Sequence, residues 1–133
     1  MKMAMQLRAE FEAGTLDPKH FGHREHIQLG WLYIKEYPLL QAMELFTGSL
    51  KSYVARVGST EKYSETITWF FLCLIAQRQA KGAFGTYEAF VEANADLLCN
   101  AGQLLKDHYK DETLKGGLTR QHFILPDNIH RLS

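Results

Sequence analysis

Two histidines three residues apart are the feature of this sequence that could do chemistry. His23 and His26 lie in the segment 21–31, which reads F-G-H-R-E-H-I-Q-L-G-W. Imidazole rings bind transition metals and act as acids or bases near neutral pH. On a helix, one face would carry His23, His26, Ile27, Gly30, Trp31 and Ile34. We therefore expect both histidines to face the core, where each ring needs a polar partner.

The segment 63–69 offers such partners. It reads Y-S-E-T-I-T-W and leads into the most apolar stretch of the chain. Glu65 carries a carboxylate to the start of that stretch, and a carboxylate is a natural partner for an imidazole. The side chains that we expect to contact a ligand at such a site are Tyr63, Thr66, Thr68, Trp31 and Trp69.

Three interpretations of the group His23, His26 and Glu65 compete. In the first, the three side chains bind a divalent transition metal such as iron, zinc or manganese, as facing helices of a bundle can. In the second, there is no metal, and Glu65 orients His26 or His23 as a general base, with Glu65 and His26 as the expected catalytic pair. In the third, the three groups satisfy one another as a buried structural network. The sequence has neither an H-E-x-x-H nor a paired E-x-x-H motif, so spacing does not decide between them.

The other four histidines have weaker contexts. His20 stands one turn before His23 and is either a third ligand or, as we favour, a surface residue of a loop. His108, His122 and His130 are scattered through the less regular C-terminal part. We expect these three to lie on the surface, the alternative being that His108 or His122 folds back on the site.

The elements that position these residues are predicted to be helices. Glycine and proline divide the chain into helix-sized segments over residues 4–13, 20–36 or 22–36, 39–57, 61–81, 87–98, 103–109 and 112–114. Segment 61–81 is apolar on almost all sides, which is typical of a central helix, and Ser59 or Thr60 is its expected cap. No segment alternates convincingly as a strand. The sequence thus predicts an all-α fold, a compact bundle of about five or six helices.

Composition limits the class of protein. The chain has 133 residues, which suits a single helical domain over residues 1–133. Its 15 basic and 15 acidic side chains give a formal net charge of zero, so we expect no nucleic-acid partner. The sequence lacks a signal-peptide pattern, a membrane-length apolar run and a C-x-x-C pair. We expect a cytoplasmic protein without a membrane partner, with Cys73 and Cys99 reduced and Cys73 acting as a small hydrophobe.

Three motifs together resemble a family of small bacterial all-helical proteins. They are F-x-H-x-x-H at residues 21–26, Y-x-E-T-x-T at residues 63–68 and L-P-D at residues 125–127. The resemblance extends from about Phe11 to Asp127. It implies no particular reaction, and it groups the same residues that helix geometry groups.

The sequence leaves two functions open. One is a metal-dependent enzyme that acts on a small molecule at the His23, His26 and Glu65 site. The other is a non-catalytic module that binds a small molecule or a protein, a second copy of itself in a homodimer included. An enclosed cavity at the three residues would favour ligand chemistry. An exposed apolar face on the helix at 39–57 or on the tail would favour protein interaction.

Overall fold

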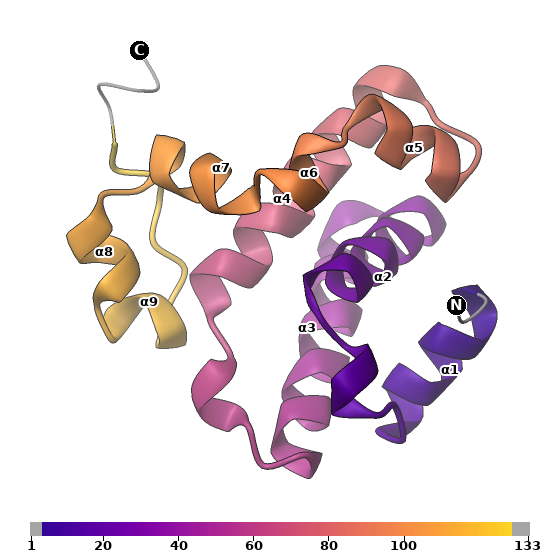
Figure 1. The fold of residues 1–133 in the computed structure, drawn as a ribbon, viewed down its shortest axis with the longest axis horizontal. Coiled ribbons are helices and arrows are strands. Elements are labelled where there is room, and N and C mark those ends of the chain that lie inside the picture. The colour runs from indigo at the N-terminus through magenta and orange to yellow at the C-terminus, as the bar shows by residue number, and fades with distance from the viewer. Residues whose placement is uncertain (1–3, 129–133) are drawn as a thin grey trace.

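The computed structural model describes residues 4–128, and that part of the chain is helical without a strand (Figure 1). Its α-helices are α1 (Ala4–Ala13), α2 (His23–Glu36), α3 (Leu39–Arg56), α4 (Glu65–Gly82), α5 (Tyr87–Ala93), α6 (Asp96–Cys99), α7 (Ala101–His108), α8 (Asp111–Lys115) and α9 (Leu118–Gln121). Two 3₁₀ turns, η1 (Pro18–His20) and η2 (Thr60–Lys62), precede α2 and α4. The predicted all-α bundle with an apolar central helix is confirmed.

The start of the central helix differs from the prediction. Ser64, rather than Ser59 or Thr60, caps α4, because its hydroxyl accepts a hydrogen bond from the backbone N–H of Ile67 at 3.2 Å. The preceding residue, Tyr63, is extended. Residues 60–62 therefore form a separate turn, and Glu65 is the first residue of the helix.

The predicted helix over residues 87–98 is also divided. Thr86 caps it as expected, by accepting from the backbone N–H of Ala89 at 3.1 Å. Asn94 then leaves the helical conformation, and its side chain donates to the carbonyl of Phe90 at 2.8 Å. A short polar side chain that bonds the local backbone competes with the helix in this way. This break, together with short helices in the tail, makes the helices more numerous than predicted.

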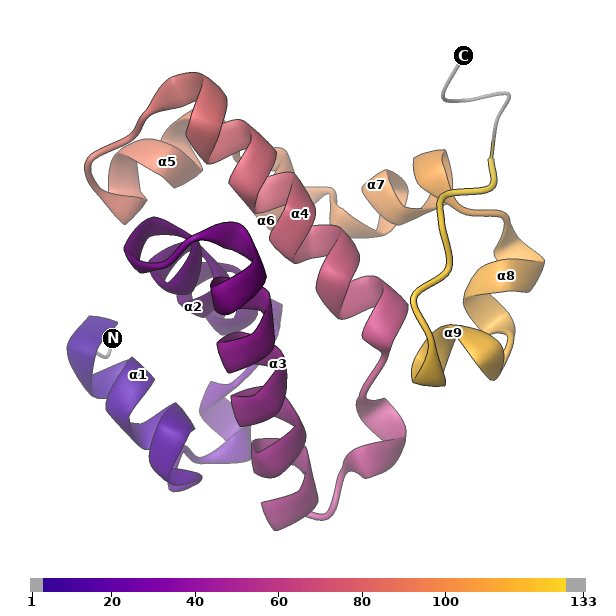
Figure 2. The ribbon, with the colours of Figure 1, turned by 180° about the vertical axis from the view of Figure 1, so that it is seen from behind.

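Two hydrophobic cores meet along α2 and α4 (Figures 1 and 2). The N-terminal core joins α1, α2 and α3 with Leu72 of α4, and its largest members are Phe11, Tyr33, Phe46, Leu50 and Tyr53. The C-terminal core joins α2, α4, α5 and α6, and its largest members are Trp31, Phe70, Phe71, Phe90 and Tyr109. Since both cores contain residues of α2, one side of this helix packs on α1 and α3 and another side packs on α4, α5 and α6.

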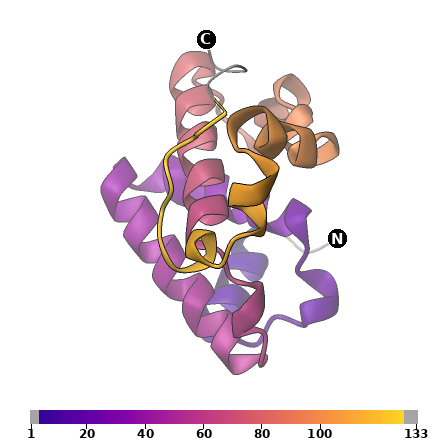
Figure 3. The same cartoon turned by 90° about the vertical axis from the view of Figure 1, so that its left-hand side faces the viewer.

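The segment 122–128, here called the strap, lies beside the first turns of α4 (Figure 3). Thr66 attaches the strap to α4, because its hydroxyl donates to the carbonyl of His122 at 2.6 Å and accepts from the N–H of Ile124 at 3.0 Å. Thr66 has 0% of its surface exposed. The Y-x-E-T-x-T motif thus places one threonine in a structural contact.

The L-P-D motif holds the other end of the strap. Asp127 accepts hydrogen bonds from the backbone N–H of Lys110 at 2.9 Å and from the hydroxyl of Thr113. These bonds keep the pKa of the Asp127 carboxyl below its usual value. The buried Tyr109 adds a bond from its hydroxyl to the carbonyl of Ile124 at 2.7 Å. The tail is therefore fixed by bonds from Thr66 and Tyr109 to its backbone and by bonds to the side chain of Asp127.

Candidate functional site

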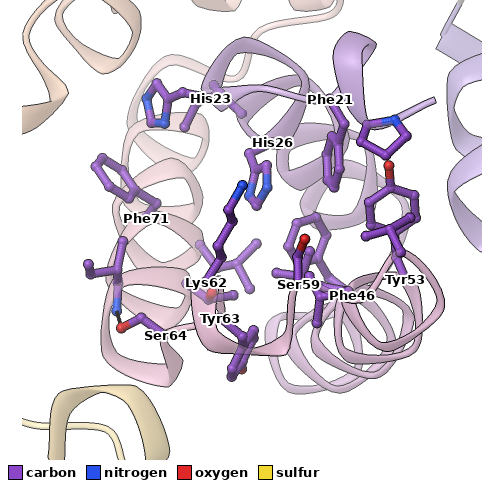
Figure 4. A pocket seen from close by; sticks show the side chains of 18 of the residues that line it. Phe21, His23, His26, Phe46, Tyr53, Ser59, Lys62, Tyr63, Ser64 and Phe71 are labelled. Atoms are coloured by element: carbon purple, nitrogen blue, oxygen red, sulfur yellow. Dashed lines mark hydrogen bonds between the residues drawn. The ribbon is translucent and has the colours of Figure 1, made fainter. Parts of the chain in front are cut away.

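A cavity of about 240 Å³ lies between α2, α3, α4 and the turn η2 (Figure 4). Most of its wall is apolar, with Phe21, Phe46, Leu50, Phe71, Leu72 and Ile75 among the lining side chains. The polar members of the lining are His23, His26, Tyr53, Ser59, Lys62, Tyr63, Ser64 and Thr68. Small-molecule sites have this form, a concave apolar surface with a few polar groups.

The start of α2 places both histidines at this cavity. The backbone N–H of Gly22 donates to the carboxylate of Glu25 at 2.7 Å, which satisfies a donor next to the first turn. His23 is the first residue of the helix, and His26 lies one turn further along the same face. The sequence prediction that the two histidines share an inner face is confirmed.

His26 is mostly buried and has no polar partner in the described chain. Its ring stacks on Phe21, with centroids 4.4 Å apart and an interplanar angle of 15°. Burial disfavours the charged imidazolium, and the nearby His23 adds repulsion, so the pKa of His26 is lowered to about 4. His26 is thus neutral at physiological pH. Its ring faces the cavity without a hydrogen bond to residues 4–128.

His23, in contrast, is held in place. Its Nε2 lies 2.6 Å from the carbonyl oxygen of Leu97 in α6, and a carbonyl only accepts, so Nε2 carries the hydrogen. The ring meets Phe71 edge-on at 5.2 Å between centroids. His23 therefore links α2 to α6.

Most other polar groups of the lining are engaged in holding the fold. Tyr53 donates to the carbonyl of Leu16 at 2.8 Å, and Ser64 donates to the carbonyl of Thr119 at 3.2 Å besides capping α4. Lys62 is different, because its exposed side chain forms no hydrogen bond or ion pair within residues 4–128. His26 and Lys62 are thus two uncommitted polar groups at one cavity.

The structure does not bring Glu65 to the histidines. Glu65 accepts a hydrogen bond from the hydroxyl of Tyr63, lies 3.5 Å from the ammonium of Lys51, and borders a separate polar depression. His23 packs beside Phe71, which is six residues and so about 9 Å further along α4. The predicted ligand set of His23, His26 and Glu65 is therefore not assembled. No group of three or more His, Cys, Asp or Glu side chains within residues 4–128 is placed to bind a metal ion.

Of the five residues predicted to contact a ligand, two line the cavity and three lie elsewhere. Tyr63 and Thr68 line the cavity. The hydroxyl of Thr66 is hydrogen-bonded to the backbone of the strap. Trp31 lies in the C-terminal core, where its indole N–H donates to Gln79 at 2.8 Å. Trp69 packs against a strap residue and not on the cavity.

The other histidines of the described residues, His20, His108 and His122, do not line the cavity. His20 in η1 and His122 in the strap are exposed, as predicted. His108 was expected on the surface but is half-buried, with Nδ1 2.8 Å from the carbonyl of Leu104 and its ring against Phe70. His130 falls outside the described residues.

Several lining residues have no counterpart in the predicted site. Phe46, Leu50, Tyr53 and Val54 come from α3, whose periodic apolar positions indicated a core face but not an unfilled space along it. Lys62 was indistinguishable by sequence from any other surface lysine. A void depends on how side chains from three helices fail to fill a volume, and a periodic pattern carries no such information.

The cysteines occupy surface positions. Cys73 and Cys99 are both free and exposed, so Cys73 does not pack in the core as its apolar sequence context suggested. Cys73 lies on a different side of α4 from the buried Leu72 and Ile75, a difference that the nearly uniform apolar sequence did not reveal. Neither cysteine lines the cavity.

Within residues 4–128, helices long and apolar enough for a membrane span are absent. No family model matches the chain, and no match is found among curated proteins or solved structures. The resemblance to a bacterial helical family therefore stays a prediction.

Proposed function

We propose that this protein binds a small, largely apolar molecule in the cavity beside His26. The observation that carries the proposal is a mostly buried, neutral imidazole that faces a space of about 240 Å³ without a hydrogen-bond partner in the described chain. The ring nitrogens of His26 are not among the fully buried, unpartnered polar atoms of residues 4–128, so a molecule in the cavity can reach them. A ligand can hydrogen-bond this ring while its apolar part contacts the walls.

The size of the cavity limits the ligand. An apolar cavity of about 150 Å³ accepts benzene, which has six carbon atoms. In proportion, this cavity suits a molecule of about ten non-hydrogen atoms. Such a molecule corresponds to a medium-length alkyl chain or a substituted single ring, not to a nucleotide or a peptide.

Binding is better supported than catalysis. A general base works best when its pKa lies near the working pH, and the pKa of His26 lies at about 4. Glu65, which would orient such a base, is bonded to Tyr63 instead. The interpretation as a metal-dependent enzyme lacks support, because no three potential ligand side chains within residues 4–128 are grouped to bind a metal ion.

Exposed apolar side chains give little support to a protein-interaction module. On α3, Leu39, Leu40 and Leu45 are 43%, 83% and 39% exposed. At 100° per residue these three point in different directions and do not form one face. Leu118 and Leu125 are exposed on other elements. Scattered apolar residues are normal on a protein surface.

A titration with octanol, followed by the NMR signals of Val, Leu and Ile methyl groups, tests the proposal. We expect saturable shifts concentrated at lining residues such as Leu50, Val54 and Ile75. Val54→Phe, which places a larger side chain at the cavity, should weaken binding about tenfold or more. Val91→Phe, on α5 and away from the cavity, is the matched control and should leave the affinity unchanged.

Two results would contradict the proposal. One is the absence of saturable shifts for octanol and for a substituted ring such as a cresol. The other is binding that Val54→Phe and Val91→Phe weaken equally, because that would place the ligand elsewhere.

A further inference from the structure

The charges around the cavity favour one class of ligand. No aspartate or glutamate is among the described residues that line it, while Lys62 and two histidines are. Resting on the function proposed above, we infer that the ligand carries an anionic head group, of the carboxylate kind, held between the ammonium of Lys62 and the imidazole of His26. The apolar tail would then occupy the space between α3 and α4.

Lys62 has the position and the freedom for this role. It belongs to η2, and its side chain extends into the cavity in the direction of the His26 ring (Figure 4). Its ammonium has no ion pair within residues 4–128. Lys51 offers a useful contrast, since its ammonium lies 3.5 Å from Glu65 and is already compensated. Lys62 is thus the cation at the cavity that a ligand could neutralise.

His26 supplies the second contact. A neutral imidazole has one N–H donor, which can bond to one oxygen of a carboxylate while Lys62 pairs with the other. The other titratable groups that line the cavity are His23 on α2, Tyr53 on α3 and Tyr63 after η2, and none of them is an acid that would repel an anion near neutral pH. Burial and a hydrogen bond to Glu65 also raise the pKa of Tyr63, which keeps its hydroxyl neutral.

Other head groups use these contacts less well. A ligand hydroxyl would hydrogen-bond His26 and leave the ammonium of Lys62 in water. Leaving Lys62 hydrated costs little free energy, but such a ligand gains no binding energy from the charge of Lys62. An ammonium would be repelled by Lys62 and would find no carboxylate in the lining. An anion is the head group that gains from both residues.

Three probes of equal chain length separate these cases: octanoate, octanol and octylamine, titrated into the full-length protein near neutral pH. Lys62→Met should weaken octanoate about tenfold, because a hydrogen bond to a charged group is lost. It should leave octanol within about twofold. Lys81→Met is the matched control, because Lys81 is exposed at the end of α4 and does not line the cavity. It should change neither affinity.

A second readout follows His26 itself. Hexanesulfonate stays anionic at every pH used, so any pH dependence belongs to the protein. Its binding should raise the pKa of His26, measured by histidine ring NMR signals, because a nearby anion favours the imidazolium. Octanol should not raise it. In His26→Gln the affinity for hexanesulfonate should become independent of pH across the His26 titration range.

The outcomes distinguish the two proposals. Octanoate binding that is equally tight in the wild type and in Lys62→Met would overturn the anionic head group, as would octylamine binding as tightly as octanoate. If octanol still bound at the cavity in that case, the function proposed above would stand. A lack of binding by all three probes would overturn both.

Discussion

The cavity beside His26 and the strap contact at Thr66 differ in how their polar groups are used. Both are built around α4. The cavity contains residues of the F-x-H-x-x-H and Y-x-E-T-x-T motifs, and the strap contact contains Thr66 of the second motif. Thr66 is fully buried, and its hydroxyl both donates and accepts a backbone hydrogen bond. His26 is mostly buried, but its ring faces a void and has no partner in residues 4–128.

This difference separates stability from function. A buried polar group whose bonds are complete contributes to the fold, and its removal leaves other groups unpaired. A buried polar group that faces a cavity adds little to the fold and is free to bind a ligand. Substitutions at the strap should therefore act on stability, and substitutions at the cavity should act on ligand affinity and on pH dependence.

The largest expected effect belongs to the strap. Thr66→Val keeps the shape of the side chain but removes the hydroxyl, which leaves the carbonyl of His122 and the N–H of Ile124 without this partner. Two such groups at about 2 kcal/mol each should lower the free energy of unfolding by about 4 kcal/mol. Urea unfolding measures this loss.

The control for that substitution is Thr68→Val, two residues along on the same helix. Thr68 is half-buried and lines the cavity. Its replacement should cost less than about 1 kcal/mol. Equal losses in the two variants would remove the distinction between the strap and the cavity.

The next effect is the acid sensitivity of the cavity. His26 has an ordinary pKa of 6.5 when unfolded and of about 4 when folded, so the unfolded chain binds more protons between these values. The stability that neutral His26 allows is therefore complete above about pH 6.5. It is lost as the pH falls toward 4, by about 3 kcal/mol in all.

Urea unfolding across this pH range tests the assignment to His26. His26→Phe should remove the corresponding part of the pH dependence, since phenylalanine does not titrate and can stack on Phe21 in the same way. His20→Ala, at an exposed position, should retain it. A wild-type profile that survives in His26→Phe would assign the acid sensitivity to another group.

The sequence predicted the elements well because they depend on local rules. The first helix has the predicted bounds, and Pro38 and Gly58 lie just outside the ends of α2 and α3 as expected. Gly58 has φ at +74°, a conformation that glycine adopts without strain. Periodicity predicted the face of α2 that buries Ile27, Gly30 and Trp31, but it did not predict the burial of Leu29 and Tyr33 on another side of the helix. Each of the predicted features is encoded within a few neighbouring residues.

The site itself was predicted only in part, because partners and voids are properties of several helices at once. The pattern indicated that His26, Glu65 and Thr66 were polar residues near a core. It could not show that Thr66 would pair with the strap, that Glu65 would pair with Tyr63, or that His26 would be left alone. A cap at Ser64 in place of Thr60 was enough to place Glu65 at the very start of α4.

A smaller loss of stability is expected for a substitution at Glu65, which belongs neither to the cavity lining nor to the strap contact. Glu65→Gln keeps the size of the side chain and an acceptor for the Tyr63 hydroxyl, but it removes the charge that faces Lys51. The loss, including the helix N-terminal interaction, should be about 1 kcal/mol in thermal unfolding, with or without a chelator.

The affinity for octanoate tests whether Glu65 is separate from the cavity or acts together with His26, as the sequence suggested. Glu65→Gln should bind octanoate as the wild type does, whereas His26→Gln should bind it less tightly. If the two variants weakened binding equally, or if the chelator lowered the melting temperature of the wild type alone, Glu65 would act together with His26 after all.

The smallest effect on stability, and the most informative about the cavity, is expected at Gly30. A Cβ atom there would lie 3.1 Å from Cδ1 of Ile75 and 3.3 Å from Cδ2 of Leu72, both flexible ends of side chains that line the cavity. In a densely packed core such crowding costs about 1–3 kcal/mol. Here the two side chains can move into the void, and alanine gains about 1 kcal/mol of helix propensity over glycine.

Gly30→Ala should therefore change the free energy of unfolding by less than about 1 kcal/mol while weakening octanol binding about threefold. Gly48→Ala on α3, where nothing lies within 4 Å of the added atom, should gain stability and leave octanol binding unchanged. A large loss of stability in Gly30→Ala would mean that Leu72 and Ile75 have no space to enter, and the cavity would then be closed in solution.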